Sequence, residues 1–223
     1  MLRHTESTRP GYVQVSDEEE IERVAHVIEK IKKEYDISVS VDTYKVGVAK
    51  EAFVAGADML NDIWGLLYEG EGACVNKECM AKVVKEYNAS VCLMHNDTLV
   101  MNENNIQIVI DRLKKSIDMA KKCGISDDKI MIDPGIGFAK SYENNLYVIK
   151  HMDKLKELDK PILLGISNKS MIGYATGKDV TNRLSGNIAG AMYGISKGAR
   201  FLRVHDVAAH VDAINMYKAI MEI

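Results

Sequence analysis

Polar side chains follow six short apolar runs in this sequence, each at the carboxyl end of its run. In chain order the series is Asp42, Asn61–Asp62, Met94–Asn96, Asp133, Ser167–Ser170 and Arg203–Asp206. Carboxylates only accept hydrogen bonds, so the aspartates suit a ring edge that is rich in N–H groups. Lys169 suits the opposite edge of such a ring, where it donates to a carbonyl or a ring nitrogen. These residue types predict a site for a flat heterocycle with N–H groups along one edge.

Three basic side chains extend the predicted site towards an anion. Arg9, Arg203 and His205 form a cationic rim, which suits a diphosphate. Each polar residue alone has a plainer explanation, because an Asp after a strand is most often a helix N-cap and a lone His is most often structural. A polar residue at the end of all six runs favours a shared binding site instead.

The polar residues separate apolar segments that alternate in type. We expect strands at Ser38–Val41, Asp58–Leu60, Ser90–Met94, Lys129–Ile132, Ile162–Ile166 and Phe201–Val204. Helices are expected after them at Lys45–Ala55, Val75–Tyr87, Asn104–Cys123, Glu143–Leu158, Asp179–Lys197 and Ala208–Met221. A leading helix precedes the first strand, because Ser16 to Glu19 has the pattern of a capping box before an apolar stripe that includes Val24 and Ile28.

This alternation predicts an α/β fold with a parallel sheet and helical crossovers. Six βα units and a leading helix resemble most of a (β/α) TIM barrel of eight units, in which ligands bind at the carboxyl ends of the strands. On this interpretation the chain lacks a first strand, a first helix and most of a second strand. No linker or change in composition divides residues 1–223, so we expect one N-terminally truncated domain.

Composition and charge exclude several classes of protein. The formal net charge of −3 gives no nucleic-acid footprint. No apolar stretch approaches the ~18 residues of a membrane span, and the N-terminus has no signal-peptide pattern. The cysteines have no CxxC spacing, so we expect reduced thiols in a cytoplasmic protein at Cys74, Cys79, Cys92 and Cys123.

Several motifs, in the right order along nearly the whole chain, resemble those of the dihydropteroate synthases. The first is TESTRPGY at Thr5–Tyr12, and SVDTYKVGVAKEAFVAGADMLNDIWG follows at Ser40–Gly65. The others are LMHN at Leu93–Asn96, DPGIGF at Asp133–Phe138, GISNKSMIG at Gly165–Gly173 and RVHDV at Arg203–Val207. The ordered series is far more specific than any one short motif.

The resemblance implies a role for each candidate residue. The pterin ring is held by Asp42, Asn61, Met94, Asp133, Gly165 and Lys169. The aminobenzoate pocket is formed by Thr8, Pro10, Phe138 and Ser170, and the diphosphate is bound by Arg9, Arg203 and His205. The implied reaction joins 6-hydroxymethyl-7,8-dihydropterin diphosphate to 4-aminobenzoate and releases diphosphate in folate biosynthesis. Asp133, Lys169 and Arg203 are the expected catalytic residues, acting through charge stabilisation and orientation rather than as nucleophiles.

The chain departs from the family pattern at two places. Asn168 stands where the family has Arg, so we expect weaker diphosphate binding. The family's first strand, whose loop reads Asn-Val-Thr-Pro-Asp-Ser-Phe, has no counterpart. Its Asn is the metal-side ligand, so no metal ligand is assigned here, although Mg²⁺ is the cofactor that the resemblance implies. We therefore expect pterin binding to survive better than turnover.

Two other interpretations remain open on the sequence. A methyltetrahydrofolate:corrinoid methyltransferase would share the Asp and Asn ring contacts but lack the Ser-x-Lys-Ser and Arg-Val-His-Asp segments. A catalytically impaired pterin-binding paralogue or fragment would keep the ring contacts without turnover. For a dihydropteroate synthase the expected partners are the two small-molecule substrates, with no nucleic acid or membrane. The resemblance also implies a homodimer formed through the helices at Asp179–Lys197 and Ala208–Met221.

Overall fold

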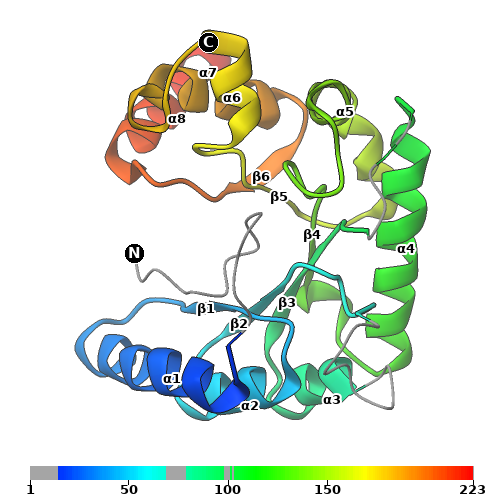
Figure 1. Cartoon of the computed structure of the whole chain (residues 1–223), viewed down its shortest axis with the longest axis vertical. Coiled ribbons are helices and arrows are strands. Elements are labelled where there is room, and N and C mark those ends of the chain that lie inside the picture. The colour runs from blue at the N-terminus through cyan, green and yellow to red at the C-terminus, as the bar shows by residue number, and fades with distance from the viewer. Residues whose placement is uncertain (1–14, 69–78, 98–100, 102, 223) are drawn as a thin grey trace. The chain divides into compact units, whose positions relative to one another are not determined.

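The chain forms two compact units, which consist of Met1–Met94 with Lys115–Ile130 and of His95–Lys114 with Met131–Ile223. The computed structural model describes residues 15–68, 79–97, 101 and 103–222. In the described residues six strands alternate with helices along the sequence, as expected for an α/β protein. The colours of Figure 1, from blue to red, follow these elements in chain order.

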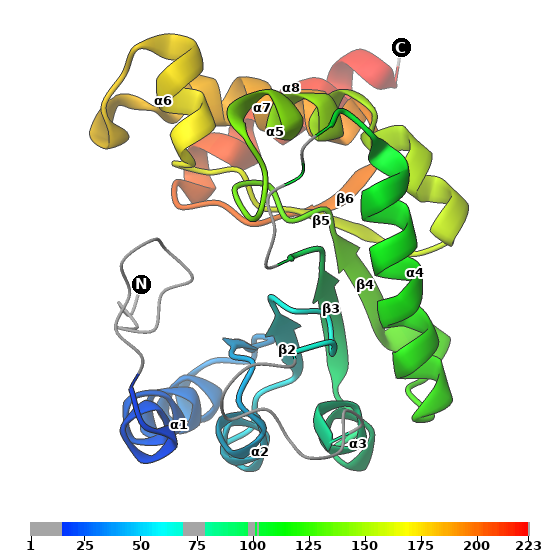
Figure 2. The ribbon, with the colours of Figure 1, turned by 45° about the vertical axis from the view of Figure 1, so that its right-hand side comes forward.

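The first unit is built on three parallel strands. They are β1 (Ser40–Asp42), β2 (Met59–Asp62) and β3 (Ser90–Met94), and Asp42 pairs in register with Asn61. Three helices, α1 (Asp17–Glu34), α2 (Val46–Val54) and α3 (Cys79–Glu86), lie side by side along this sheet (Figure 2). The carboxyl ends of the strands therefore bring their polar residues to one edge.

Local sequence explains how α1 begins and how it packs. The Ser16 side chain accepts a hydrogen bond from the Glu19 amide at 3.2 Å, which confirms the N-cap half of the predicted capping box, whereas the Glu19 carboxylate pairs with Arg23 instead of completing the box. Val24 and Ile28 are buried, one turn apart on one face of the helix, and α1 packs against α2. Apolar burial of this kind stabilises the helix, since each such side chain contributes about 1.5–3 kcal/mol.

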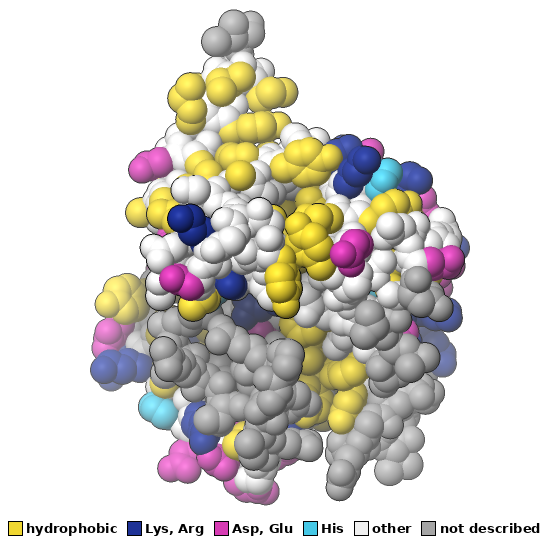
Figure 3. All heavy atoms as spheres, turned by 45° about the horizontal axis from the view of Figure 1, so that its top comes forward, with side chains coloured by type: hydrophobic (Ala, Val, Ile, Leu, Met, Phe, Trp, Pro, Cys, Tyr) yellow, Lys and Arg dark blue, Asp and Glu magenta, His cyan; other side chains and the backbone are white. Residues whose placement is uncertain are grey.

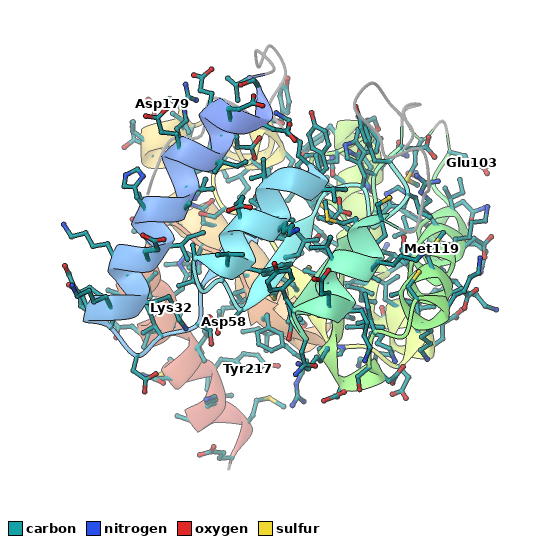
Figure 4. All side chains as sticks on the ribbon, turned by 90° about the horizontal axis from the view of Figure 1, so that it is seen from below. Lys32, Asp58, Glu103, Met119, Asp179 and Tyr217 are labelled. Carbon is teal, nitrogen blue, oxygen red and sulfur yellow. The ribbon has the colours of Figure 1, made fainter. Side chains whose placement is uncertain are left out.

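An ion pair holds the amino ends of the strands in the first unit. Lys32 in the last turn of α1 contacts Asp58, just before β2, at 3.0 Å, and Figure 4 shows the two side chains together. Asp58 also accepts a hydrogen bond from the Val39 amide at 2.7 Å, just before β1. This end of the sheet thus carries structural contacts, whereas the candidate chemistry lies at the other end.

The second unit also contains three parallel strands, β4 (Ile130–Asp133), β5 (Ile162–Leu164) and β6 (Ala199–Leu202). Its helices pack along the sheet and on each other, as seen at the top of Figure 1. They are α5 (Tyr142–Lys150), α6 (Ser170–Thr176), α7 (Leu184–Ser196) and α8 (Val207–Met221), with 3-10 turns η2 (Met152–Leu158) and η3 (Val180–Asn182). Helix α4 (Ile106–Lys122) contributes residues to both units, and η1 (Asp127–Lys129) precedes β4.

The strand predictions are confirmed to within two residues at each end, but two predicted helices need correction and one helix was not predicted. The helix predicted at Glu143–Leu158 breaks at His151 and continues as a 3-10 turn, and Leu146 in its first part is 40% exposed. The helix predicted from Asp179 begins only at Leu184. The short helix α6 was missed, because the four polar residues before Met171 look like a plain loop.

Two further expectations meet the structure here. Cys92 and Cys123 form no disulfide, but Cys79 is disulfide-bonded, so the expectation of reduced thiols is wrong at that position. Cys74 lies outside the described residues. In the part of the chain that the structure describes, no helix is long and apolar enough to cross a membrane.

Candidate active site

Asp133 is the last residue of β4 and is held by the turn that follows it. Its Oδ1 accepts a hydrogen bond from the Gly135 amide at 2.7 Å, and its side chain is buried. Gly135 has a φ of 67°, and a Cβ at this position would lie 1.9 Å from the carbonyl oxygen of His95. Only glycine fits there, so the turn that orients the carboxylate depends on this residue type.

Burial and the neighbouring charges shift the pKa of Asp133 in opposite directions. Burial raises the pKa of the Asp133 carboxyl to about 6. The Gly135 amide and the positive charges of Lys169, Lys140 and Arg203 act in the opposite direction. A carboxylate surrounded in this way is costly to ionise without a donor, and it therefore suits a ligand that brings N–H groups to it.

Lys169 lies across the loop that follows β4. Its Nζ stands 4.2 Å from the centre of the Phe138 ring, a cation–π contact. A Cβ on Gly137 would lie 3.0 Å from Cδ of Lys169, so this glycine leaves room for the lysine stem. The structure thus brings together Asp133, Phe138 and Lys169, as the sequence predicted.

Gly165, just after β5, lies beside both Asp133 and Arg203. A Cβ on Gly165 would be 3.8 Å from Oδ2 of Asp133 and 3.8 Å from Cβ of Arg203. The Arg203 amide donates to the Leu164 carbonyl at 3.0 Å, which fixes its backbone next to β5. The absence of a side chain at Gly165 therefore keeps the space between a carboxylate and an arginine open.

His205 is oriented by a buried serine. Its Nδ1 lies 2.9 Å from Oγ of Ser167, and its amide donates to the same oxygen at 3.3 Å. Arg203 and His205 are both exposed, whereas Ser167 is buried. The two predicted cations therefore follow β6 on the surface of the second unit, which suits an anion that arrives from solvent.

Asn168 is turned towards α7. It adopts a φ of 61°, its amide donates to Oδ1 of Asn187 at 2.9 Å, and Nδ2 of Asn187 donates back to Oδ1 of Asn168 at 2.8 Å. Nη1 of Arg183 donates to the Asn168 carbonyl at 2.9 Å. Asn187 is fully buried, so this reciprocal pair fixes the loop from which Lys169 projects. Sequence reasoning gave Asn187 no role, because nothing in its local pattern marks a long-range partner.

Four further predicted residues belong to the aminobenzoate and diphosphate contacts. Ser170 is the first residue of α6 and is exposed. The predicted contacts Thr8, Arg9 and Pro10 lie outside the described residues.

The first unit collects the other candidates at the ends of its strands. Asp42 is half-buried and pairs in register with buried Asn61, and Met94 is buried at the end of β3. Asp62, named in the sequence series without a role, accepts hydrogen bonds from the Trp64 amide and the Leu66 amide, each at 2.8 Å. Burial raises its pKa to about 6, and the charge of Asp42 adds to that rise.

Comparison with known proteins identifies the family. The pterin-binding enzyme model matches residues 4–205. A dihydropteroate synthase of Clostridium beijerinckii is 47% identical over 212 residues, which cover 95% of this chain and 76% of that protein. The chain belongs to the dihydropteroate synthase family of pterin-binding enzymes.

Solved dihydropteroate synthases share the fold as well as the sequence. The enzyme of Clostridium difficile, solved in the presence of pteroic acid, matches with a TM-score of 0.89 and 44% identity over 96% of this chain and 79% of that chain. The enzyme of Xanthomonas albilineans, solved with 4-aminobenzoic acid, matches with a TM-score of 0.90 and 36% identity over 98% of this chain and 77% of that chain. These matches confirm the predicted TIM-barrel-like class and favour a dihydropteroate synthase over a corrinoid methyltransferase.

Proposed function

We propose that this chain joins 6-hydroxymethyl-7,8-dihydropterin diphosphate to 4-aminobenzoate, giving 7,8-dihydropteroate and diphosphate in folate biosynthesis. The observation that carries the proposal is the grouping of Asp133, Lys169, Phe138 and Arg203 in one unit of a dihydropteroate synthase family member. A dihydropteroate synthase of Xanthomonas albilineans has been solved in complex with 7,8-dihydropteroate, which supports the choice of product.

The pterin ring is assigned to Asp133 and Lys169. The Asp133 carboxylate accepts hydrogen bonds from ring N–H groups, and Lys169 donates to the carbonyl or nitrogen edge. Gly165 leaves room beside the carboxylate for the ring. The ring contacts of Asp42, Asn61 and Met94 stay predictions.

The reaction needs charge stabilisation and orientation. The bond from the pterin methylene carbon to the diphosphate oxygen breaks, the aminobenzoate nitrogen bonds to that carbon, and the nitrogen releases a proton. Arg203 and His205 stabilise the negative charge that develops on the departing diphosphate. Phe138 and Ser170 are the aminobenzoate contacts, which hold the amine in line behind the carbon.

Mg²⁺ stays an expectation taken from the family. Among the described residues no group of three or more His, Cys, Asp or Glu side chains is arranged to hold a metal ion. A cytoplasmic location likewise stays a prediction.

A homodimer through the last two helices is part of the proposal. Apolar side chains gather on the face formed by the C-terminal helices, as Figure 3 shows, and the exposed ones on α8 are Val207, Val211, Met216, Ile220 and Met221. Sedimentation of the parent should give a dimer, and a Met216→Glu, Ile220→Glu double variant should give a monomer. Val54→Glu, an equally exposed apolar position on α2, is the matched control and should stay dimeric.

The activity itself is tested by product formation from the two substrates with Mg²⁺ present. The parent and a Lys150→Met control, which alters an exposed lysine of α5, should form dihydropteroate at equal rates. Lys169→Met should lower the rate about a hundredfold, since it removes both a ring donor and the cation over Phe138. Absence of both product formation and pterin binding in the parent would refute the proposal.

A further inference from the structure

Lys140 places its ammonium inside the loop that follows β4. Its Nζ lies 2.9 Å from the carbonyl oxygen of Gly135 and 3.0 Å from that of Phe138. It also lies 2.7 Å from Nδ1 of His95. One side chain therefore ties both ends of the turn between Asp133 and Phe138 to His95.

His95 supplies the fixed surface against which this loop is held. Its side chain is buried, its amide donates to the Asp133 carbonyl at 2.9 Å, and its own carbonyl lies against Gly135. Burial lowers the pKa of His95 to about 3, and the charges of Lys140 and Arg112 add to this, against a smaller opposing effect of Asp97. The imidazole is thus neutral, and its Nδ1 accepts from the lysine.

The rest of the loop is tied at other points. The Phe138 amide donates to the Gly135 carbonyl at 3.1 Å, and the Gly137 amide donates to Oδ1 of Asn145 at 2.6 Å. The Met101 amide donates to the Ala139 carbonyl at 2.9 Å. These bonds are between uncharged groups, whereas the Lys140 ammonium adds a charged donor that contacts two loop carbonyls and His95 together.

Lys140 also belongs to the set of charges around Asp133. Burial lowers the pKa of Lys140 to about 7; the Asp133 charge opposes that shift, and the Lys169 charge adds to it. In return the Lys140 charge works with Lys169 and Arg203 to lower the pKa of Asp133 against its burial. The lysine therefore affects both the shape of the loop and the charge state of its carboxylate.

We propose that Lys140 is a positioning residue that holds Asp133 and Phe138 in the arrangement in which they meet the pterin and the aminobenzoate. It acts through the loop carbonyls and through its charge, and it does not itself touch either substrate. The part of this inference that concerns the substrates rests on the proposed function. The effect of Lys140 on the pKa of Asp133 does not, because it is measured without a ligand.

The first experiment needs no ligand. Carboxyl-carbon NMR should show that the pKa of Asp133 rises above that of the parent in Lys140→Met, because one of its three facing cations is removed. Lys140→Arg, which keeps the charge, should restore most of the parent value. Lys150→Met is the matched control and should leave Asp133 unchanged. An equal pKa in the parent and Lys140→Met would overturn the proposal, whether or not the protein proves to be a synthase.

The second experiment separates positioning from loss of structure. In Lys140→Met the KM for 4-aminobenzoate should rise about tenfold, because the Gly135 and Phe138 carbonyls each lose the lysine hydrogen bond and Phe138 shifts. The acid limb of pterin affinity should move to higher pH together with the Asp133 pKa. A general loss of structure would instead lower the affinity equally at all pH values, and that result would overturn the proposal. An unchanged KM with an unchanged acid limb would do the same.

If Lys140→Met fails to fold, two other measurements test the proposal. Lys140→Gln keeps a donor for one carbonyl without the charge, and it should raise the Asp133 pKa as Lys140→Met does. In the Asp133→Asn variant the pKa of Lys140 should fall below about 7, since the carboxylate that raises it is gone. An unchanged Lys140 pKa there would show that the two groups are uncoupled and that the proposal is wrong.

Discussion

Asp62 and Asp133 are two buried carboxylates that end strands in different units, and they make an informative pair. Burial raises the pKa of each to about 6, and each is followed by a tight turn whose amides it accepts. The neighbours differ in charge. Asp62 has another carboxylate, Asp42, nearby, whereas Asp133 has three cations, at Lys140, Lys169 and Arg203.

The hydrogen bonds of the two groups differ as well. Both oxygens of Asp62 accept backbone amides, Oδ1 from Trp64 and Oδ2 from Leu66. Asp133 accepts the Gly135 amide on Oδ1, and its Oδ2 lies beside Gly165, which has no side chain of its own. A carboxylate that accepts backbone amides therefore has a structural role in the Asp62 loop. In the Asp133 loop one carboxylate oxygen is left to accept from a ligand. What separates the two is the charge and the space around the second oxygen.

The largest expected effect is on pterin binding. Asp133→Asn should weaken the binding of a pterin about ten- to hundredfold, because the amide –NH₂ meets ring N–H groups where a carboxylate oxygen accepted them. Asp62→Asn should change the affinity by less than about threefold. Calorimetric titration of both variants with one pterin measures the ratio. Equal losses would erase the distinction between the two loops.

The same two variants should differ in the free energy of unfolding. Asn keeps one acceptor oxygen, so Asp133→Asn retains the Gly135 hydrogen bond, whereas Asp62→Asn leaves one of two backbone amides without an acceptor. Asp133→Asn should therefore be the more stable variant by about 1–3 kcal/mol. Urea unfolding at one pH provides the comparison, and a more stable Asp62→Asn would contradict it.

Stability should depend on pH through Asp133 in a defined direction. The ordinary value of 3.8 describes the unfolded chain, and the folded value is about 6. Between these values the folded protein holds a proton that the unfolded chain has lost, so this group's contribution to stability falls as pH rises through the window. Asp133→Asn removes that loss. It should gain on the order of 2 kcal/mol over the parent at pH 7 and little near pH 4. A constant difference across this range would rule out the raised pKa.

Much of this arrangement was predictable from the sequence, because strand ends and turn residues are local signals. The apolar runs before Asp42, Asn61 and Asp133 placed all three at the carboxyl ends of strands, and the structure confirms this. The family motifs then assigned their roles. That residues 1–223 form one domain, and that the chain is truncated, stay predictions.

What the sequence did not reveal depends on contacts between distant residues. The pair of Asn168 with Asn187 joins positions 19 apart, and the contact of His95 with Lys140 joins positions 45 apart. Neither has a periodic or local pattern. The break of the helix at His151 was also not predicted, because Met152 and Leu155 remain buried in the 3-10 turn and keep the apolar spacing of a helix.

A smaller effect is expected at Asn168. Asn168→Arg adds a cation near the anion site, so diphosphate affinity should rise a few-fold at low salt. The substitution also breaks the reciprocal hydrogen bonds with Asn187 and should cost about 1 kcal/mol of stability. Calorimetry with diphosphate and a urea titration measure the two effects. Asn187→Ala is the control, since it should lose the stability without the gain in affinity.

The smallest effect concerns backbone strain in the Asp133 loop. Ala139 has a φ of 46°, a conformation that favours glycine. Ala139→Gly should therefore stabilise the protein by about 0.5–1 kcal/mol. Ala189→Gly, at an exposed position inside α7, is the matched control and should destabilise by a similar amount. The same sign for both in thermal unfolding would show that the loop is not strained.

The raised pKa of Asp133 makes ligand binding an exchange of a proton. At pH 6 about half of these carboxyls are protonated before the ring arrives. Because Oδ1 already accepts the Gly135 amide, a protonated Oδ2 would face the ring N–H groups as a donor, so binding favours the ionised carboxylate and releases that proton to the buffer. The heat measured for binding should then vary with the ionisation enthalpy of the buffer at pH 6 and become independent of it near pH 8.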